Sequence, residues 1–295
     1  MKGTNSAKAA EEAGLTSEDI NKLIDIAKES SKAGGEILMS YYGKLDSIKS
    51  KKYEGDLVTD ADIAAEKRVL EILNNKSPDI DVLAEESGRK GTENNLQWCV
   101  DPLDGTTNFA HSYPFFATSV GLTWKGIPIL GSIDIPYLKE NYWGAPGLGA
   151  YCNHKNIKTS QTSKLSNSLL VTGFAYDRQQ RLDNNYAEFC WLTHRTRGVR
   201  RGGAAAVDLA FTASGRVDGY WERGLAKWDL AAGVSIVELA GGSVSDYHGN
   251  NFNLSSGRVL ACSPGIKAEL IAVLKQAKPL MGEMYGAPEI IDLGS

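Results

Sequence analysis

The sequence of 295 residues predicts a mixed α/β fold. Apolar residues recur at helical spacing over residues 16–43 and again over about 60–75. Residues 115–171 have the pattern of strands instead, with a hairpin over 118–135 that turns at Lys125-Gly126. Helical and strand-like segments alternate after that. The long hairpin section argues against a purely doubly wound parallel sheet, so we expect an α+β mixture.

The first helix is expected to begin at Thr16, because Thr16 and Asp19 fit a capping box. Its Gly34-Gly35 pair indicates close packing rather than a break. The second helix carries Asp60 and Asp62 in its first turn, where acidic residues also stabilise a helix through its dipole without any further function.

Strands are expected over 80–84, 96–100, 168–173 and 217–222, and further helices over 185–194, about 204–213, about 227–240 and 266–277. Acidic residues stand at several of these boundaries. Glu85-Glu86 follows the 80–84 strand, and Asp229 lies in the first turn of the 227–240 helix. Glu85 could therefore point toward the same place as the acids after the 96–100 strand, although a solvated turn is an open alternative for Glu86.

Composition and charge exclude several classes of protein. The net charge of −4 gives no basic surface for nucleic acid, and no apolar run approaches the roughly 18 residues of a membrane helix. The four cysteines form no C-x-x-C pair, which argues against a zinc site or a disulfide framework. Isolated thiols suit a reducing compartment, so we expect a cytoplasmic protein with no nucleic-acid or membrane partner.

The stretch DPLDGT at 101–106 is the motif that carries chemistry. Pro102 cannot continue a central ladder, so Asp101 and Asp104 are expected where the strand ends, facing one small volume. Two carboxylates that close repel each other unless a cation is present, and Mg²⁺ bound through oxygens is the simplest such cation. A helix start at Gly105-Thr106 would hold a phosphate through its N–H groups. The pattern indicates phosphoryl chemistry, although Asp-Pro and Asp-Gly are also common turn dipeptides.

Four motifs together resemble the inositol monophosphatase family: DLVTDAD at 56–62, AEES at 84–87, DPLDGTTNF at 101–109 and WDLAAG at 228–233. Their order and spacing agree with the family over about residues 17–275. The resemblance implies a layered α-β-α-β-α sandwich, Mg²⁺ dependence, Li⁺ sensitivity and a homodimer. It also implies one catalytic domain over 17–278, preceded by a disordered lead-in over 1–16 and followed by a tail over 279–295.

The resemblance further implies a role for each matching residue. The metal ligands of two Mg²⁺ ions would be Glu85, Asp101, the backbone carbonyl of Leu103, Asp104 and Asp229, and a third, weaker ion would be linked to Asp62. The catalytic residues that orient the attacking water would be Glu85, Thr106 and Asp62. The substrate would contact Asp104, Gly105, Thr106, Gly203, Ala205, Glu222 and Lys51.

Several nearby residues are interpreted without a catalytic role. Asp60 and Glu86 are expected to be solvated or capping acids, and His111 a packing or surface residue. Arg200 and Arg201 are compatible with a phosphate contact and equally with ion pairs on the surface or at a subunit contact.

The implied reaction is hydrolysis of a phosphate monoester of a small polyol, with myo-inositol monophosphate as the first choice. Histidinol phosphate, fructose 1,6-bisphosphate and 3′-phosphoadenosine phosphates are the alternative substrates, since Gly131–Pro136 is reminiscent of the histidinol-phosphatase branch. A regulatory protein that binds the transcription machinery is the alternative of another class.

Overall fold

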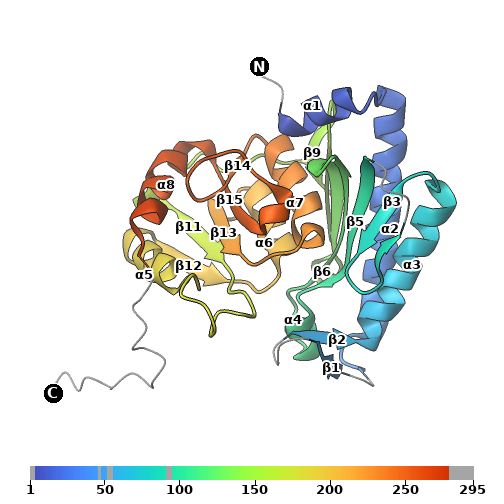
Figure 1. Ribbon diagram of the computed structural model, residues 1–295, viewed down its shortest axis with the longest axis horizontal. Helices are drawn as coiled ribbons and strands as arrows, with labels where there is room; N and C mark the ends of the chain where they lie inside the picture. Colours follow the sequence, from blue (N-terminus) through green and yellow to red (C-terminus); the bar gives the residue numbers. More distant parts are fainter. Residues whose placement is uncertain (1–3, 46–47, 52–55, 91–94, 279–295) are drawn as a thin grey trace.

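The computed structural model describes residues 4–45, 48–51, 56–90 and 95–278, which form alternating layers of helices and sheets (Figure 1). One helix pair covers one face of an eight-stranded sheet, a second pair lies between this sheet and a five-stranded sheet, and a third covers the outer face of the latter. In that order the pairs are α2 (Ser17–Tyr41) with α3 (Asp60–Lys76), α6 (Ala205–Ala213) with α7 (Lys227–Leu239), and α5 (Tyr186–Arg195) with α8 (Lys267–Gln276). The mixed α/β class and the layered α-β-α-β-α prediction are confirmed.

The eight-stranded sheet has the order β10-β9-β8-β7-β6-β5-β3-β4 and is antiparallel except for the β3–β5 pair. The strands are β3 (Asp81–Ala84), β4 (Gly88–Lys90), β5 (Leu96–Asp104), β6 (Ala117–Trp124), β7 (Ile127–Ile135), β8 (Glu140–Ala145), β9 (Gly149–Cys152) and β10 (Lys155–Asn156). The predicted hairpin is the β6–β7 pair. Because β3 and β5 are parallel neighbours, the residues that follow both strands meet at one edge of the sheet.

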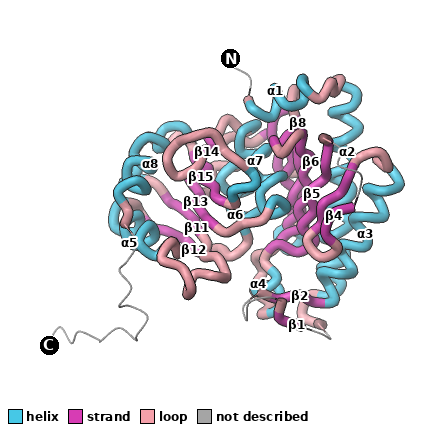
Figure 2. Tube along the Cα trace, viewed as in Figure 1, coloured by secondary structure: helices cyan, strands magenta, loops and turns pink. Residues whose placement is uncertain are grey.

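The five-stranded sheet has the order β12-β11-β13-β15-β14 (magenta in Figure 2). Its strands are β11 (Leu169–Thr172), β12 (Gly198–Arg201), β13 (Gly219–Arg223), β14 (Ser243–Ser245) and β15 (Arg258–Cys262). The remaining elements are the ribbon of β1 (Ile48–Ser50) and β2 (Leu57–Thr59), the helices α1 (Asn5–Glu12) and α4 (Thr106–Ala110), and short 3-10 turns at Pro136–Leu138, Leu165–Asn167, Leu254–Ser256 and Pro264–Ile266. A separate apolar cluster fills each interface between layers, so each sheet is buried on both faces.

Helix α2 begins with the predicted capping box, in which Asp19 N–H donates to Thr16 Oγ1 and Thr16 N–H donates to Asp19 Oδ2. The helix continues through Gly34-Gly35. A Cβ on Gly34 would lie 2.6 Å from Thr118 Cγ2, and one on Gly35 would lie 2.2 Å from Asp134 Oδ2. The glycines therefore let the helix backbone approach the sheet closely, as predicted.

Strand β5 is longer than predicted, because the expected strand ended at residue 100. It continues to Asp104 across Pro102, and its register with β6 shifts between Asp101 and Asp104. Side chains supply the missing ladder bonds, because Leu103 N–H donates to Asp101 Oδ1 at 3.0 Å and Thr118 Oγ1 donates to Pro102 O at 2.9 Å. A bulge of this kind tolerates a proline and turns both aspartates toward one side.

The prediction of a disordered lead-in over 1–16 is wrong for the residues of it that the structure describes, 4–16. Residues 5–12 form helix α1, capped by Thr4 and packed against β7 and α7. Glu238 of α7 accepts hydrogen bonds from Asn5 Nδ2 at 2.9 Å, Ser6 N at 3.2 Å and Ser6 Oγ at 2.9 Å. The segment is rich in alanine, and its order comes from this docking rather than from a local apolar stripe.

The predicted tail over 279–295 lies outside the described residues. Within the described part of the chain, none of the helices combines the length and the apolar character that crossing a bilayer demands.

The docking of α1 can be tested through Ala9, whose side chain is 1% exposed. We expect Ala9→Asp to lower Tm by about 5 °C or more, because the substitution buries a carboxylate without a partner. Its exposed neighbour serves as the control, and Lys8→Asp should shift Tm by less than about 2 °C. Equal Tm values for the two variants, measured by calorimetry, would contradict a docked α1.

Candidate active site

A cavity of about 240 Å³ opens between the two sheets, and Glu85, Asp101, Asp104 and Asp229 all line it. These residues come from three separate parts of the chain. Glu85 follows β3, the two aspartates end the neighbouring strand β5, and Asp229 lies in the first turn of α7. The structure thus brings together all four side chains that were predicted as metal ligands.

Backbone donors hold three of these segments in place. Glu85 N–H donates to Val100 O at 3.1 Å, which continues the β3–β5 pairing past the last ladder residue. The two oxygens of Asp104 accept from Ala205 N at 3.0 Å and Ala206 N at 2.7 Å, at the first turn of α6. Asp229 Oδ2 accepts from Ala226 N at 2.7 Å. Helix starts favour carboxylates, so α6 and α7 fix two of the acids.

The four carboxylates form a strongly destabilised set of negative charges. Burial raises the pKa values of Glu85, Asp104 and Asp229 to about 7, and neighbouring carboxylates add to the effect for Glu85 and Asp229. Burial raises the pKa of Asp101 well above its ordinary value, with Glu85 and Asp104 contributing. The site therefore calls for additional positive charge.

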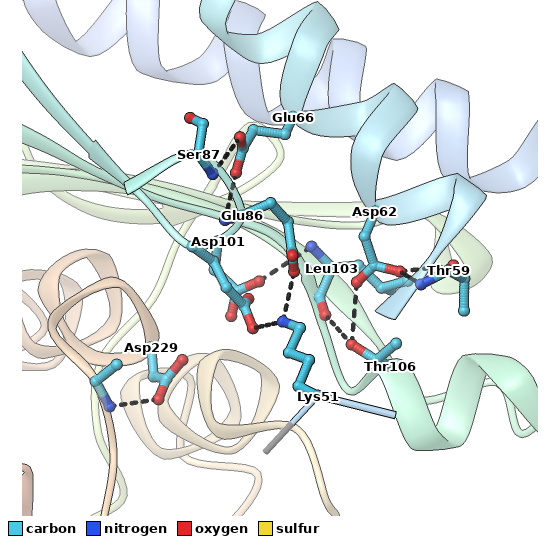
Figure 3. Close-up of polar contacts among 12 residues, drawn as sticks. Lys51, Thr59, Asp62, Glu66, Glu86, Ser87, Asp101, Leu103, Thr106 and Asp229 are labelled. Carbon is cyan, nitrogen blue, oxygen red and sulfur yellow. Dashed lines mark hydrogen bonds and ion pairs between the residues drawn. The ribbon is translucent and has the colours of Figure 1, made fainter. Parts of the chain in front are cut away.

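Lys51 supplies part of that charge. Its Nζ lies 2.7 Å from Glu85 Oε1 and 2.5 Å from Glu86 Oε1, and Figure 3 shows its side chain extending toward Glu86. Burial lowers the pKa of Lys51, but the two carboxylates outweigh burial and hold its pKa above the ordinary value. Glu86 is thus paired and largely buried, which corrects the prediction of a solvated or capping acid.

Asp62 and Thr106 face each other across the start of α3 (Figure 3). Asp62 Oδ2 accepts from Thr59 N at 2.8 Å and Thr59 Oγ1 at 2.6 Å. Thr106 Oγ1 lies 3.1 Å from Asp62 Oδ1 and 3.0 Å from Leu103 O. Burial raises the pKa of Asp62 to about 6. The capping acid of α3 is therefore Asp62, not Asp60, whose buried Oδ1 has no partner among the described residues.

The chemistry of this donor set fits a hard divalent ion. Every donor is an oxygen: four carboxylates and the Leu103 carbonyl, which lies between two of them in β5. Within the described ranges, no three acidic, histidine or cysteine side chains stand close enough together to share an ion.

The other side of the cavity contains the predicted substrate contacts. Gly105, Thr106, Gly203, Ala205 and Glu222 line it. Gly105 has a φ of +89°, and a Cβ there would lie 3.0 Å from Phe115 O. Helix α4, which begins right after it, is only 5 residues long. Burial raises the pKa of Glu222 to about 7, and Tyr220 donates to its Oε2 at 2.7 Å.

Arg200, Arg201 and His111 can also be placed. Arg200 and Arg201 end strand β12 and are both exposed, but Arg201 lines the cavity whereas Arg200 does not. His111 ends α4 and is exposed, which agrees with its interpretation as a surface residue.

Glu66 was missed by the sequence reasoning. It lies one turn after Asp62 on α3 and is 4% exposed. Its Oε2 accepts from Glu86 N at 2.8 Å and its Oε1 accepts from Ser87 N at 2.9 Å, so it clamps the turn that carries Glu85. The spacing of four residues from Asp62 on one helix face is the signal that could have identified it.

Comparisons with known proteins agree with this site. The model of the inositol monophosphatase family matches residues 19–279. An inositol-1-monophosphatase from Synechocystis sp. is 50% identical over 270 residues, which cover 91% of this chain and 94% of the relative. A solved inositol monophosphatase structure from Anabaena (Nostoc) sp. superposes with a TM-score of 0.82 at 49% identity, covering 89% of this chain and 98% of that one.

A more distant relative has a different name. The Nus factor SuhB from Pasteurella multocida is 33% identical over 268 residues, which cover 90% of this chain and 99% of the relative. The family model extends over most of the chain, and the relatives align over nearly their full lengths. The chain therefore belongs to the inositol monophosphatase family.

Proposed function

We propose that this protein is a Mg²⁺-dependent phosphatase that hydrolyses a phosphate monoester, with myo-inositol monophosphate as its preferred substrate. The observation that carries the proposal is the convergence of four carboxylates with raised pKa values on one cavity, of which Asp101 and Asp104 are buried and Glu85 and Asp229 half-buried. Family membership and the name of the Synechocystis relative support the choice of substrate.

The metal would be held by oxygens alone. Glu85, Asp101 and the Leu103 carbonyl would bind one Mg²⁺, and Asp101, Asp104 and Asp229 a second, while a third would be linked to Asp62. When bound, Mg²⁺ lowers the pKa of water and offsets the charge that develops on the phosphate and on the departing alcohol oxygen.

The protein's own groups would orient the attacking water. The Thr106 hydroxyl donates its single proton to Asp62 or to Leu103 O, which leaves the hydroxyl oxygen able to accept from water. Glu85 would accept a further hydrogen bond from that water. Two hydrogen bonds from Thr59 already fix Asp62, which in turn orients the Thr106 hydroxyl. The hydroxyl therefore needs little reorganisation before it accepts from the water.

Substrate binding would use the remaining lining of the cavity. Backbone N–H groups at Gly105 and Thr106, with Lys51, would contact the phosphate. Glu222 would accept hydrogen bonds from substrate hydroxyls, and Gly203 and Ala205 leave space for a ring because their side chains are small. The substrate is thus a small phosphorylated polyol. We further propose a cytoplasmic homodimer without nucleic-acid or membrane partners.

A regulatory role is the second candidate function, and the SuhB relative, named as a Nus factor, is the observation that favours it. The complete set of site acids argues against a purely non-catalytic protein. Capture of purified RNA polymerase by the immobilised chain would support an additional role, and a failure to bind at micromolar concentration would remove it.

The metal assignment predicts that Asp101→Asn abolishes Mg²⁺-dependent hydrolysis, a loss of at least about 100-fold in kcat, because it removes an acid shared by both proposed metal positions. Asp60→Asn is the matched control, since it makes the same chemical change at an acid outside the proposed ligand set. Near wild-type turnover by folded Asp101→Asn, or full activity of the wild type in excess EDTA, would disprove the assignment.

The substrate assignment predicts a higher kcat/KM for myo-inositol 1-phosphate than for histidinol phosphate, fructose 1,6-bisphosphate or 3′-phosphoadenosine phosphates. The expected margin is about tenfold or more, the scale of about 1.5 kcal/mol that one hydrogen bond from a hydroxyl to a charged group contributes. Phosphate release would be measured at equal Mg²⁺ concentration, with and without Li⁺. A higher value for any of the other esters would reassign the substrate while leaving the phosphatase class intact.

The raised pKa values predict how stability depends on pH. Folding raises the pKa of Asp62 from 3.8 to about 6 and those of Asp104 and Asp229 from 3.8 to about 7. The folded state therefore binds more protons than the unfolded state in this window, and the free energy of unfolding of the metal-free protein falls as pH rises through it. We expect Tm in EDTA to be lower at pH 8 than at pH 5.5, by about 5 °C or more.

Mg²⁺ should reverse most of that loss at pH 8 and have little effect at pH 5.5, because protonated acids are poor ligands. Differential scanning calorimetry at constant ionic strength would measure both effects. A Tm in EDTA that is equal or higher at pH 8 would contradict the electrostatic account of the site.

A further inference from the structure

The segment 173–185, between β11 and α5, contributes part of the lining of the cavity. Phe174, Ala175 and Tyr176 of this segment line the cavity. Tyr176 is 45% exposed, and its hydroxyl forms a hydrogen bond with the side chain of Thr107 in α4. The segment thus reaches from the five-stranded sheet to the eight-stranded-sheet side of the cavity.

Burial raises the pKa of Tyr176 to about 12, and the carboxylate of Asp56 also raises it. The carboxylates of Glu85 and Asp229 act in the same direction. Tyr176 lines the same cavity as these acids, so a molecule bound there lies beside it.

Two arginines of the five-stranded sheet hold this segment. Arg223 donates from Nη1 and Nη2 to the two oxygens of Asp177, at 2.8 and 3.1 Å, and its Nε lies 3.6 Å from Asp183 Oδ2. Arg258 forms an ion pair with the same Asp183. A two-pronged pair of this kind fixes orientation as well as distance.

The carboxylates of Asp177 and Asp183 also stabilise the five-stranded sheet. Arg223 and Arg258 are directly opposite partners on β13 and β15. Like charges in that position destabilise a sheet, and the Arg223 side chain is only 8% exposed. Asp177 and Asp183 of the segment neutralise the two arginines. The same ion pairs therefore hold the segment and stabilise the sheet.

The segment is also fixed at both ends. Gly224 has a φ of +79°, and a Cβ there would lie 2.5 Å from the Cβ of Ala175, so only glycine allows this close contact. At the other end, Asn185 Nδ2 donates to Thr172 Oγ1 at 2.8 Å and to Gly173 O at 2.7 Å.

Strand β13 serves both sides of the substrate region. Successive residues on a strand point to opposite faces, so Glu222 faces the cavity while Arg223 faces the segment. Arg223 is not among the residues that line the cavity. Arg223 can act on the reaction through the segment that it holds and through its charge, which lowers the pKa of Glu222. In neither case does it line the cavity, which makes it a positioning residue.

We propose that Arg223, by holding Asp177, positions Tyr176 against the alcohol part of the substrate and so selects ring polyol phosphates over phosphates of short-chain alcohols. This inference rests on the proposed phosphatase function. The acids would engage the phosphate, and Tyr176, which lines the same cavity, would then meet the alcohol.

The test compares Arg223→Met with Arg216→Met. Arg216 makes an equivalent two-pronged pair with Glu140, at 2.7 and 2.5 Å. Like Arg223 it does not line the cavity, but its partner lies outside the segment 173–185. For Arg223→Met we expect KM for myo-inositol 1-phosphate to rise about tenfold with kcat within about twofold, and kcat/KM for glycerol 2-phosphate to stay within about twofold. Arg216→Met should change neither substrate. Arg223→Lys keeps the charge without the fork and should give an intermediate KM.

A second measurement does not depend on activity. Arg178 and Arg181 lie within the segment, so trypsin should cleave there faster in Arg223→Met than in the wild type or in Arg216→Met. Unchanged cleavage in both Arg223 variants would overturn the positioning role. An equal loss of kcat/KM on both esters, or no change on either, would overturn the role in specificity. If the wild type hydrolyses no ester, the proposed function fails, while the cleavage rates still decide whether Arg223 holds the segment.

Discussion

The repulsion among buried carboxylates is the constraint on which the rest of this structure depends. Glu85, Asp101, Asp104 and Asp229 line one cavity, and burial raises the pKa of each. Lys51 offsets only part of this repulsion through its pair with Glu85, so the surrounding layers must hold the cluster. The parallel β3–β5 pair, the starts of α6 and α7 and the clamp of Glu66 each fix one part of it.

Much of the fold could be predicted because the signals for it are local. Helix α2 has its capping box and its apolar period within the segment itself, and the β6–β7 hairpin has strands that meet at a short turn. The two errors involve partners that are distant or unusual. Helix α1 is ordered by Glu238, more than 230 residues away in the sequence, and β5 crosses Pro102 because side chains replace its ladder bonds. Neither partner leaves a pattern in the segment that depends on it.

The site shows the same division. Its acids stand in short motifs that a family resemblance can recognise, and the structure brings them to one cavity. Glu66 and Arg223 belong to no such motif, because Glu66 binds backbone N–H groups and Arg223 binds a carboxylate 46 positions away. Lys51 was expected near a phosphate and is found paired with Glu85 and Glu86. The sequence alone could not show whether Lys51 pairs with a phosphate or with the two glutamates. That depends on which buried carboxylates have no other cation nearby, and only the fold determines it.

The position of Asp229 on α7 has a consequence for biosynthesis. Because α7 lies between the two sheets and comes late in the chain, a ribosome must pass residue 229 before the acid cluster is complete. Until then Asp229, which raises the pKa of both Glu85 and Asp101, cannot add its charge to theirs. The unfavourable charge cluster thus arises only when the scaffold that withstands it is nearly finished. A partly synthesised chain is spared the electrostatic strain of its own active site.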